Sequence, residues 1–173
     1  MQRTTALAVR LGLTFLLCSP ALPNGGKAKR LVFDAHVTSG EGQWSFSTEI
    51  VPIQYRLNSI RNKYKMLQIR VDNEGGKPLR LSRTADRVEV KVGPNYVPAI
   101  LDIPGVDPAF WDSLDAGLRN ELVYPLSVDT GEEESIFVFL PLTDVKDVPG
   151  GIRYKIASES APVLLRAPSV KKQ

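Results

Sequence analysis

The 173-residue sequence predicts an antiparallel all-β fold, a sandwich or barrel with one short inserted helix. Three observations predict it. Apolar and polar residues alternate with a period of two through most of the chain. Turn-forming residues separate these segments roughly every 8 to 12 residues, and one segment alone has helical spacing. Together they indicate roughly eight to ten short strands.

The first two alternating segments predict a hairpin. Residues 31–37 place apolar or aromatic side chains at every second position, residues 44–50 do so except at Thr48, and Ser39–Gly42 supplies the turn between them. The sole histidine, His36, falls on the polar face of the first segment. This alternation is typical of strands that bury one face.

A third alternating segment predicts the clearest hairpin of the chain. In Leu67–Val71 the odd-numbered residues are apolar, and Asn73–Gly76 follows with residues that tolerate a reversal of the backbone. Pro78–Leu81 is then predicted to be the partner strand.

The remaining strands are predicted further along the chain. The run Ser135–Leu140 is apolar or aromatic at nearly every position, which predicts a strand buried in the centre of a core. The segment 163–165 is predicted to be a final edge strand. The alternating segments 88–92 and 152–156 are predicted strands, and Gly93–Asn95 is predicted to turn the chain from the first of them toward residues 96–101.

One segment favours a helix. Asp107 is a good N-cap, Pro108 suits the first helical position, and apolar residues recur from Phe110 to Leu114 at helical spacing. Gly117 can end this helix. We expect one to two turns inserted between strands, with an aromatic face covering an open edge or end of the β-structure.

Two runs resemble a known class of domain. Leu67–Leu81 is similar to the strand, Asn turn and Pro-Leu strand of secreted bacterial immunoglobulin-like domains, including domains of unknown function, and Val128–Phe139 is similar to the Gly-Glu turn and apolar strand that they carry late in the chain. The resemblance implies an antiparallel immunoglobulin-like β-sandwich and carries over no catalytic or binding residue. The chain departs from antibody-type domains, because it lacks their cysteine pair.

The first residues are typical of an export signal. Arg3 and Arg10 are followed by the uncharged apolar run Leu11–Cys18, and Ser19-Pro20-Ala21 offers small residues for cleavage. The run is shorter than the roughly 20 residues of a membrane span. A lipoprotein signal would retain Cys18 as a lipid anchor, although the residue before it, Leu17, is not small.

Cleavage after Ala21 sets the domain organisation that we expect. Residues 1–21 are the signal peptide, 22–28 a flexible mature N-terminus, 29–167 the β-sandwich domain and 168–173 a basic C-terminal tail. The mature protein is then secreted or periplasmic and has no transmembrane span and no cysteine. With two of 22 basic residues removed, 20 face 19 acidic ones, so the net charge is +1 rather than +3. Such a balance disfavours nucleic-acid binding.

No motif indicates catalysis. His36 lacks partners for a Ser-His-Asp arrangement, and nothing selects a catalytic pair from the 19 acidic residues. We expect a protein without enzymatic activity and without a cofactor. The densest candidate for Ca²⁺, a cation that takes six to eight oxygen ligands, is a set of four aspartates with a spacing unlike that of an EF-hand: Asp102, Asp107, Asp112 and Asp115.

Aromatic residues in and around the inserted segment are the predicted binding residues, because partly exposed Trp and Tyr are typical interface anchors. They are Trp111, Phe110, Tyr96 and Tyr124. The sequence therefore favours an exported binding module for a protein or a cell-envelope component. Two alternatives stay open: an envelope protein anchored through a lipid on Cys18, and a hydrolase with an unrecognised acidic site.

The export signal makes a first testable prediction. We expect the mature protein recovered from the host to begin at Leu22, because signal peptidases cleave after a small residue such as Ala21. The intact mass, measured by mass spectrometry, checks this. A mass that includes a diacylated Cys18 would contradict it and support the lipid-anchored alternative.

Overall fold

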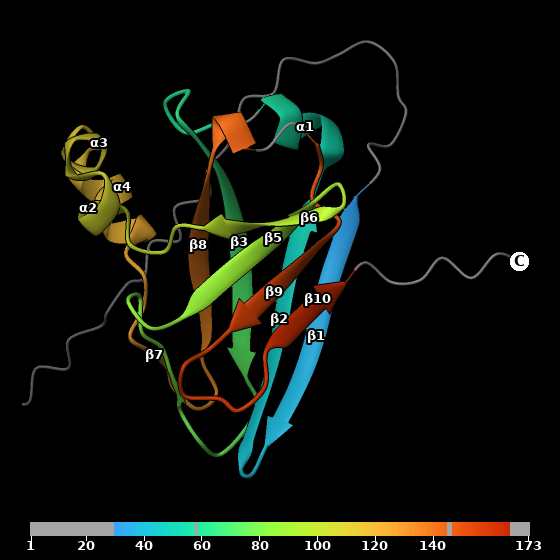
Figure 1. The fold of residues 1–173 in the computed structure, drawn as a ribbon. Helices are drawn as coiled ribbons and strands as arrows, with labels where there is room; N and C mark the ends of the chain where they lie inside the picture. Colours follow the sequence, from blue (N-terminus) through green and yellow to red (C-terminus); the bar gives the residue numbers. More distant parts are fainter. Residues whose placement is uncertain (1–29, 58, 145–146, 167–173) are drawn as a thin grey trace, which may run out of the picture.

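A computed structural model describes residues 30–57, 59–144 and 147–166 of the chain (Figure 1). The predicted signal peptide with Cys18, the mature N-terminus at 22–28 and the tail at 168–173 lie outside these residues. Within them, the prediction of an antiparallel all-β fold is confirmed. Eight strands form one sheet in the order β6-β5-β9-β10-β1-β2-β3-β8, and β4 pairs with β7 in a small second sheet.

The strands and helices follow the chain in a simple order. The strands are β1 (Leu31–Ser39), β2 (Gly42–Ile50), β3 (Tyr64–Asn73), β4 (Leu79–Arg80), β5 (Arg87–Val92), β6 (Asn95–Ala99), β7 (Ser127–Val128), β8 (Glu133–Pro141), β9 (Gly151–Lys155) and β10 (Val163–Arg166). The helices are α1 (Pro52–Leu57), α2 (Ile103–Val106), α3 (Pro108–Asp112), α4 (Ala116–Leu122) and the 3-10 turn η1 (Leu142–Asp144).

Long pairings divide the large sheet into three ribbons. β1 and β2 share nine register pairs, β3 and β8 share nine, and β5, β6, β9 and β10 form the third ribbon with four or five pairs at each contact. Among the described residues the joins between ribbons are shorter, with four pairs between β2 and β3 and one between β1 and β10, at the last described residue, Arg166. The sheet therefore consists of three well-paired ribbons, joined to one another by short stretches of pairing that we call seams.

One backbone bridge almost closes the sheet into a barrel. Just beyond β6, Ile100 and Phe139 of β8 exchange two backbone hydrogen bonds, of 2.8 and 3.0 Å. Toward β6, the next pair in this register that could exchange hydrogen bonds would be Pro98 and Pro141, which have no backbone N–H to donate. Closure therefore stops at one bridge. The strands form a nearly closed barrel-like sheet and not clearly the two facing sheets of the expected immunoglobulin-like sandwich.

The interior of this barrel is the main core. Strand alternation directs one face of each strand inward, and the largest fully buried side chains there include Trp44, Phe46 and Tyr154. The ring of Phe46 meets that of Tyr154 edge to face at 6.0 Å. Packing of this kind adds about 0.5–1.5 kcal/mol beyond the area that it buries.

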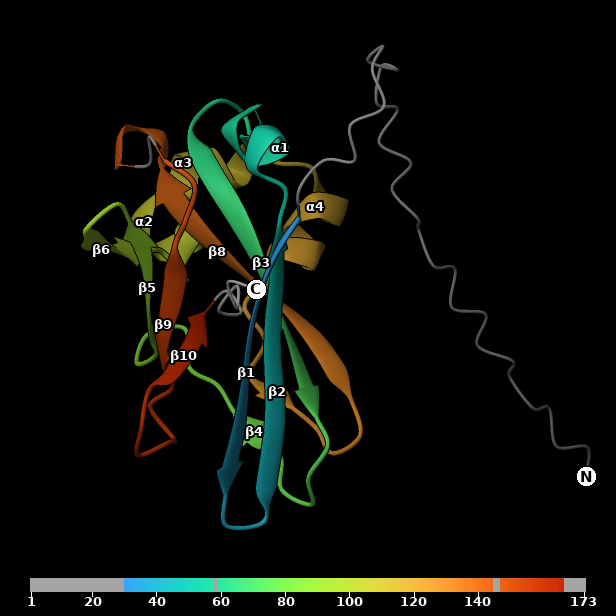
Figure 2. The same ribbon diagram turned by 90° about the vertical axis from the view of Figure 1, so that its right-hand side faces the viewer.

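A second core lies outside the barrel, under the inserted helices. Phe137 and Phe139 of β8 point outward and pack with Phe110 of α3 and Leu122 of α4. Figures 1 and 2 show α2, α3 and α4 grouped beside β8, while α1 lies at the end of the barrel. Both faces of β8 are therefore buried, as its apolar run predicts.

The inserted segment is longer than predicted. Asp107 caps α3 as expected, because its carboxylate accepts a hydrogen bond from the Phe110 N–H. The prediction that Gly117 ends the helix was wrong, since Asp115 caps a further helix, α4, that includes Gly117. α1 had no signal that the sequence analysis used.

Two strand predictions were also wrong. β3 pairs with β2 and β8, and β4 pairs with β7 rather than with β3. The reason is Asn73, whose buried side-chain amide donates to the carbonyls of Lys77 and Val128 and so directs the chain toward β7. β10, predicted at an edge, lies between β9 and β1, whereas the hairpins β1–β2 and β5–β6 are as predicted.

Asp86 fastens three connections around the barrel. Its carboxylate is 1% exposed and accepts hydrogen bonds from the Ser82 N–H at 2.8 Å, the Ala157 N–H at 2.7 Å and the Tyr124 hydroxyl at 2.6 Å. The Tyr124 hydroxyl also contacts that of Tyr154. Burial raises the pKa of both tyrosines, so both keep their protons at neutral pH.

This network predicts that Asp86→Ala lowers the free energy of unfolding by about 2 kcal/mol or more, because the buried Tyr124 hydroxyl and two part-buried N–H groups lose their acceptor and a buried donor left without one costs about 1–3 kcal/mol. Denaturant unfolding with an unchanged m-value measures the loss. The matched control is Asp34→Ala on the exposed face of β1, expected to change stability by less than about 0.5 kcal/mol. Equal losses in the two variants would refute the structural role of Asp86.

Candidate functional site

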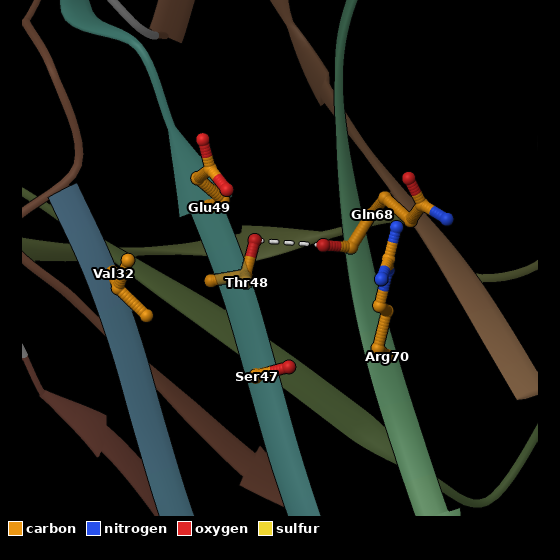
Figure 3. A pocket seen from close by; sticks show the side chains of 6 residues that line it. All are labelled: Val32, Ser47, Thr48, Glu49, Gln68 and Arg70. Atoms are coloured by element: carbon orange, nitrogen blue, oxygen red, sulfur yellow. Dashed lines mark hydrogen bonds between the residues drawn. The ribbon is translucent and has the colours of Figure 1, made fainter. Parts of the chain in front are cut away.

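The candidate site lies at the seam where β2 and β3 part. Their register ends at the pair Ser47–Arg70, although β2 continues to Ile50 and β3 begins at Tyr64. Just past the last pair, the hydroxyl of Thr48 donates to the Gln68 carbonyl at 2.7 Å (Figure 3). A side-chain hydrogen bond thus stands where the backbone pairing stops.

The strands part because each belongs to a different ribbon. β2 pairs with β1 along its whole length, and β3 pairs with β8 along nearly all of its own. Each ribbon has its own right-handed twist, so two ribbons that share four pairs diverge beyond them. Pro52 then begins α1, which turns the chain across the end of the barrel (Figure 2).

The parting leaves two adjoining hollows on the outer face of the sheet, which we call the β2–β3 groove. The first has a volume of about 190 Å³ and is lined by β1, β2 and β3. The second has about 210 Å³ and extends to α1 and β8. Glu49 and Gln68 line both hollows, so the two lie side by side.

The first hollow is polar. Figure 3 shows Ser47 and Glu49 on β2 and Gln68 and Arg70 on β3, with Val32 of β1 as its apolar border. The Gln68 amide is oriented by a hydrogen bond of 2.8 Å from its Nε2 to the Ser135 hydroxyl. A donor, an acceptor and both signs of charge therefore lie on neighbouring strands.

The charged groups of the groove have weak partners within the protein. The Glu49 carboxylate is 3.1 Å from Arg30, and Arg70 Nε is 3.9 Å from Glu133; all four side chains are about half exposed or more. Ion pairs in this setting contribute about 0–1 kcal/mol. A ligand can compete for both charges at little cost.

The second hollow has more apolar residues in its lining, with Met66, Phe137 and Tyr55 beside the polar Glu49, Gln54 and Gln68. Tyr55 holds α1 against the barrel, since the Lys65 ammonium donates to its carbonyl and lies 5.2 Å from the centre of its ring. Burial lowers the pKa of Lys65 and raises that of Tyr55, whose hydroxyl is buried with no hydrogen-bond partner among the described residues.

The predicted aromatic set is dispersed. Phe110 and Tyr124 are buried, and the Phe110 ring packs on Tyr64 at 4.9 Å. Trp111, which is half-buried, and the buried Tyr124 line a small hollow of about 20 Å³ beside the helices. Tyr96 lies on β6, where the Arg153 guanidinium is 4.1 Å from its ring centre. The structure thus brings Trp111 and Tyr124 to one hollow, places Phe110 in the same apolar cluster as Trp111, and leaves Tyr96 apart.

The four aspartates proposed for Ca²⁺ each have a separate local partner. Asp102 is 3.6 Å from Arg83, Asp107 is 2.5 Å from Lys63, Asp112 is 3.6 Å from Arg119, and Asp115 accepts from the Leu118 N–H at 2.8 Å. Among the described residues, no three His, Cys, Asp or Glu side chains gather where they could hold a metal ion. His36 is exposed on the outer face of β1, as its alternation predicts.

The groove residues do not stand out in the sequence, because they are scattered over three strands and each has the pattern of an ordinary solvent-facing position. One signal could have found them. Ser45 and Ser47 are small side chains on the outer face of β2, between longer residues on β1 and β3. A row of small side chains flanked by long ones indicates a trough.

Comparison with protein-family models, with curated proteins and with solved structures finds no match to this chain. In the part of the chain that the structure describes, no helix has the length and apolar character needed to cross a membrane.

Asp107 makes the fold sensitive to acid. Hydrogen bonds from Lys63 and Tyr64 hold the pKa of its carboxyl below the ordinary 3.8, whereas burial and the same bond raise the pKa of Tyr64 to about 12. A lowered pKa in the folded state stabilises the protein above the ordinary value, and this contribution is lost as pH falls through the lowered one.

We therefore expect Asp107→Asn, which keeps an N-cap, to be less stable than the parent at neutral pH. The difference should shrink as pH falls below the ordinary value of 3.8. Urea unfolding at a series of pH values measures it. Asp112→Asn, at a side chain 75% exposed, is the control and should differ from the parent by under about 0.5 kcal/mol at neutral pH. A pH-independent difference for Asp107→Asn would contradict the assignment.

Proposed function

We propose that this chain is an exported binding module without enzymatic activity, and that its ligand lies in the β2–β3 groove. The observation that carries the proposal is the early end of the β2–β3 register, which opens a groove lined by both polar and apolar residues on the outer face of a paired sheet. Its two hollows together reach the range of about 300–1,000 Å³ that is usual for ligand sites.

The position of the groove on strands supports a binding role. Ser47 and Arg70 are the last residues in register between β2 and β3, and their strands are paired on the far side to β1 and β8. Side chains on such elements are held more closely than side chains on loops. The polar groups therefore present a fixed pattern to a ligand.

The partner class and the location come from the sequence. The signal at residues 1–21 supports a secreted or periplasmic protein, so we propose a protein or a cell-envelope component as the ligand, with retention through Cys18 as the alternative. The groove carries both signs of charge, which supports a ligand other than nucleic acid. We also propose, as part of this assignment, that the fold belongs to the immunoglobulin-like class.

The groove can be tested by filling it. We expect Ser47→Trp to abolish ligand binding with little loss of stability, because the large ring occupies the polar hollow and Trp is favourable in strands. Nuclear magnetic resonance titration of the purified protein measures binding. Its probes are a mixture of terminally blocked random heptapeptides and a mixture of glucan and chitin oligosaccharides.

The matched control is Thr38→Trp, an exposed position near the far end of β1. We expect at least one probe to shift the amide signals of Ser47, Glu49 and Gln68 in the parent and in Thr38→Trp but not in Ser47→Trp. Shifts confined to other parts of the surface, or no shifts at millimolar probe, would overturn the proposed site.

A further inference from the structure

We propose that the ligand of the β2–β3 groove is an extended acidic peptide segment, with a carboxylate bound by Arg70 and an apolar side chain in the hollow near α1. This inference rests on the proposed function and names the chemistry of its ligand. It follows from backbone groups that face the groove, from the order of polar and apolar lining, and from the unequal pairing of the two charges.

Backbone peptide groups of both β2 and β3 point into the groove. In an antiparallel strand, the N–H and C=O of one residue point to the same neighbour, and those of every second residue do likewise. The Gln43 carbonyl accepts from the Glu74 N–H beyond β3, so the peptide groups of Glu49, six residues along β2, point toward β3 as well. There the register with β3 has already ended.

The same rule applies on the opposite side of the groove. The Gln68 carbonyl accepts from the Thr48 hydroxyl and so points toward β2. The peptide groups of Met66, two residues earlier, point the same way. Main-chain donors and acceptors of Glu49 and Met66 thus face the groove outside the paired register, and an extended peptide offers the matching groups.

The side chains that line the groove differ in type from one hollow to the other. The hollow at Ser47 and Arg70 is polar, and the hollow near α1 is bordered by Met66, Val51 and Phe137. A peptide that crosses both meets charged side chains in the first and can place an apolar side chain against Met66 and Phe137 in the second. The aromatic rings of β2, Trp44 and Phe46, point into the core and do not line the groove.

The two charged side chains of the groove are unequally paired within the protein. Glu49 has a close cationic partner, Arg30, at 3.1 Å, whereas Arg70 approaches Glu133 only through Nε and only to 3.9 Å. Figure 3 shows the Arg70 side chain extending along β3 beside Gln68, at the border of the hollow. The guanidinium of Arg70 is therefore the less well paired of the two charges. A guanidinium binds a carboxylate through two parallel hydrogen bonds. An anionic group is therefore favoured over a cationic one.

The test is a change of charge preference. The purified full chain is titrated with two heptapeptide mixtures, acetyl-XXXDXXX-amide and acetyl-XXXKXXX-amide, in which X is a random uncharged residue, and with the oligosaccharide mixture. We expect the aspartate mixture to bind at least tenfold more tightly than the lysine mixture, with shifts at the amides of Glu49, Gln68 and Arg70.

Arg70→Glu should reverse this preference, and Arg70→Gln should remove it. The control is Arg80→Glu, an exposed arginine on β4 of the small sheet, which should keep the preference of the parent. A structural effect of the Arg70 substitutions would weaken all probes equally, whereas a reversal requires contact between the charges.

Two outcomes would overturn the inference, and they are distinguishable from failure of the proposed function. If the oligosaccharides shift the groove amides and neither peptide mixture does, the groove binds a saccharide and only the peptide inference fails. If the aspartate preference survives in Arg70→Glu, the carboxylate lies elsewhere and the inference also fails. If no probe reaches the groove, the proposed function fails with it.

Discussion

The structure depends on how few backbone pairs join its three ribbons. In the part of the chain that the structure describes, nine pairs hold β1 to β2 and nine hold β3 to β8, but four join these two ribbons and single pairs or bridges make the other joins. Twist accumulates along each ribbon, so neighbouring ribbons diverge wherever their shared register is short. The barrel closes at Ile100 and Phe139 and no further, because Pro98 and Pro141 follow without N–H groups.

Side-chain interactions stabilise the seams between ribbons, where few backbone pairs are formed. Asp86 gathers two backbone N–H groups and a tyrosine hydroxyl from separate connections, and the helices beside β8 cover the outward aromatic face of the strand at the barrel closure. Asp107 ties α3 to the start of β3 through Lys63 and Tyr64. At the seam between β2 and β3, one hydroxyl from Thr48 bridges the strands, and the groove opens beside it.

The parts of the fold that the sequence predicted are those determined by neighbours in the chain. The hairpin of β1 and β2 follows from alternation around a short turn, and Asp107 caps α3 because its carboxylate reaches an N–H three residues away. The pairing of β4 failed because Asn73 bonds to Val128, 55 residues later. For the site, residue types were visible in the sequence, but the groove joins positions from three strands whose divergence no local pattern records.

The sequence by itself determined that the chain forms antiparallel strands, which residues face inward, where one helix begins, and that its start has the composition of an export signal. Periodicity and capping are local properties, so they can be read without knowing which strands pair. Only the tertiary structure decided the strand order, the near closure of the barrel and the parting of β2 from β3, because these depend on register between distant segments. The groove exists for that reason, and its binding chemistry belongs to the arrangement of the strands rather than to any one of them.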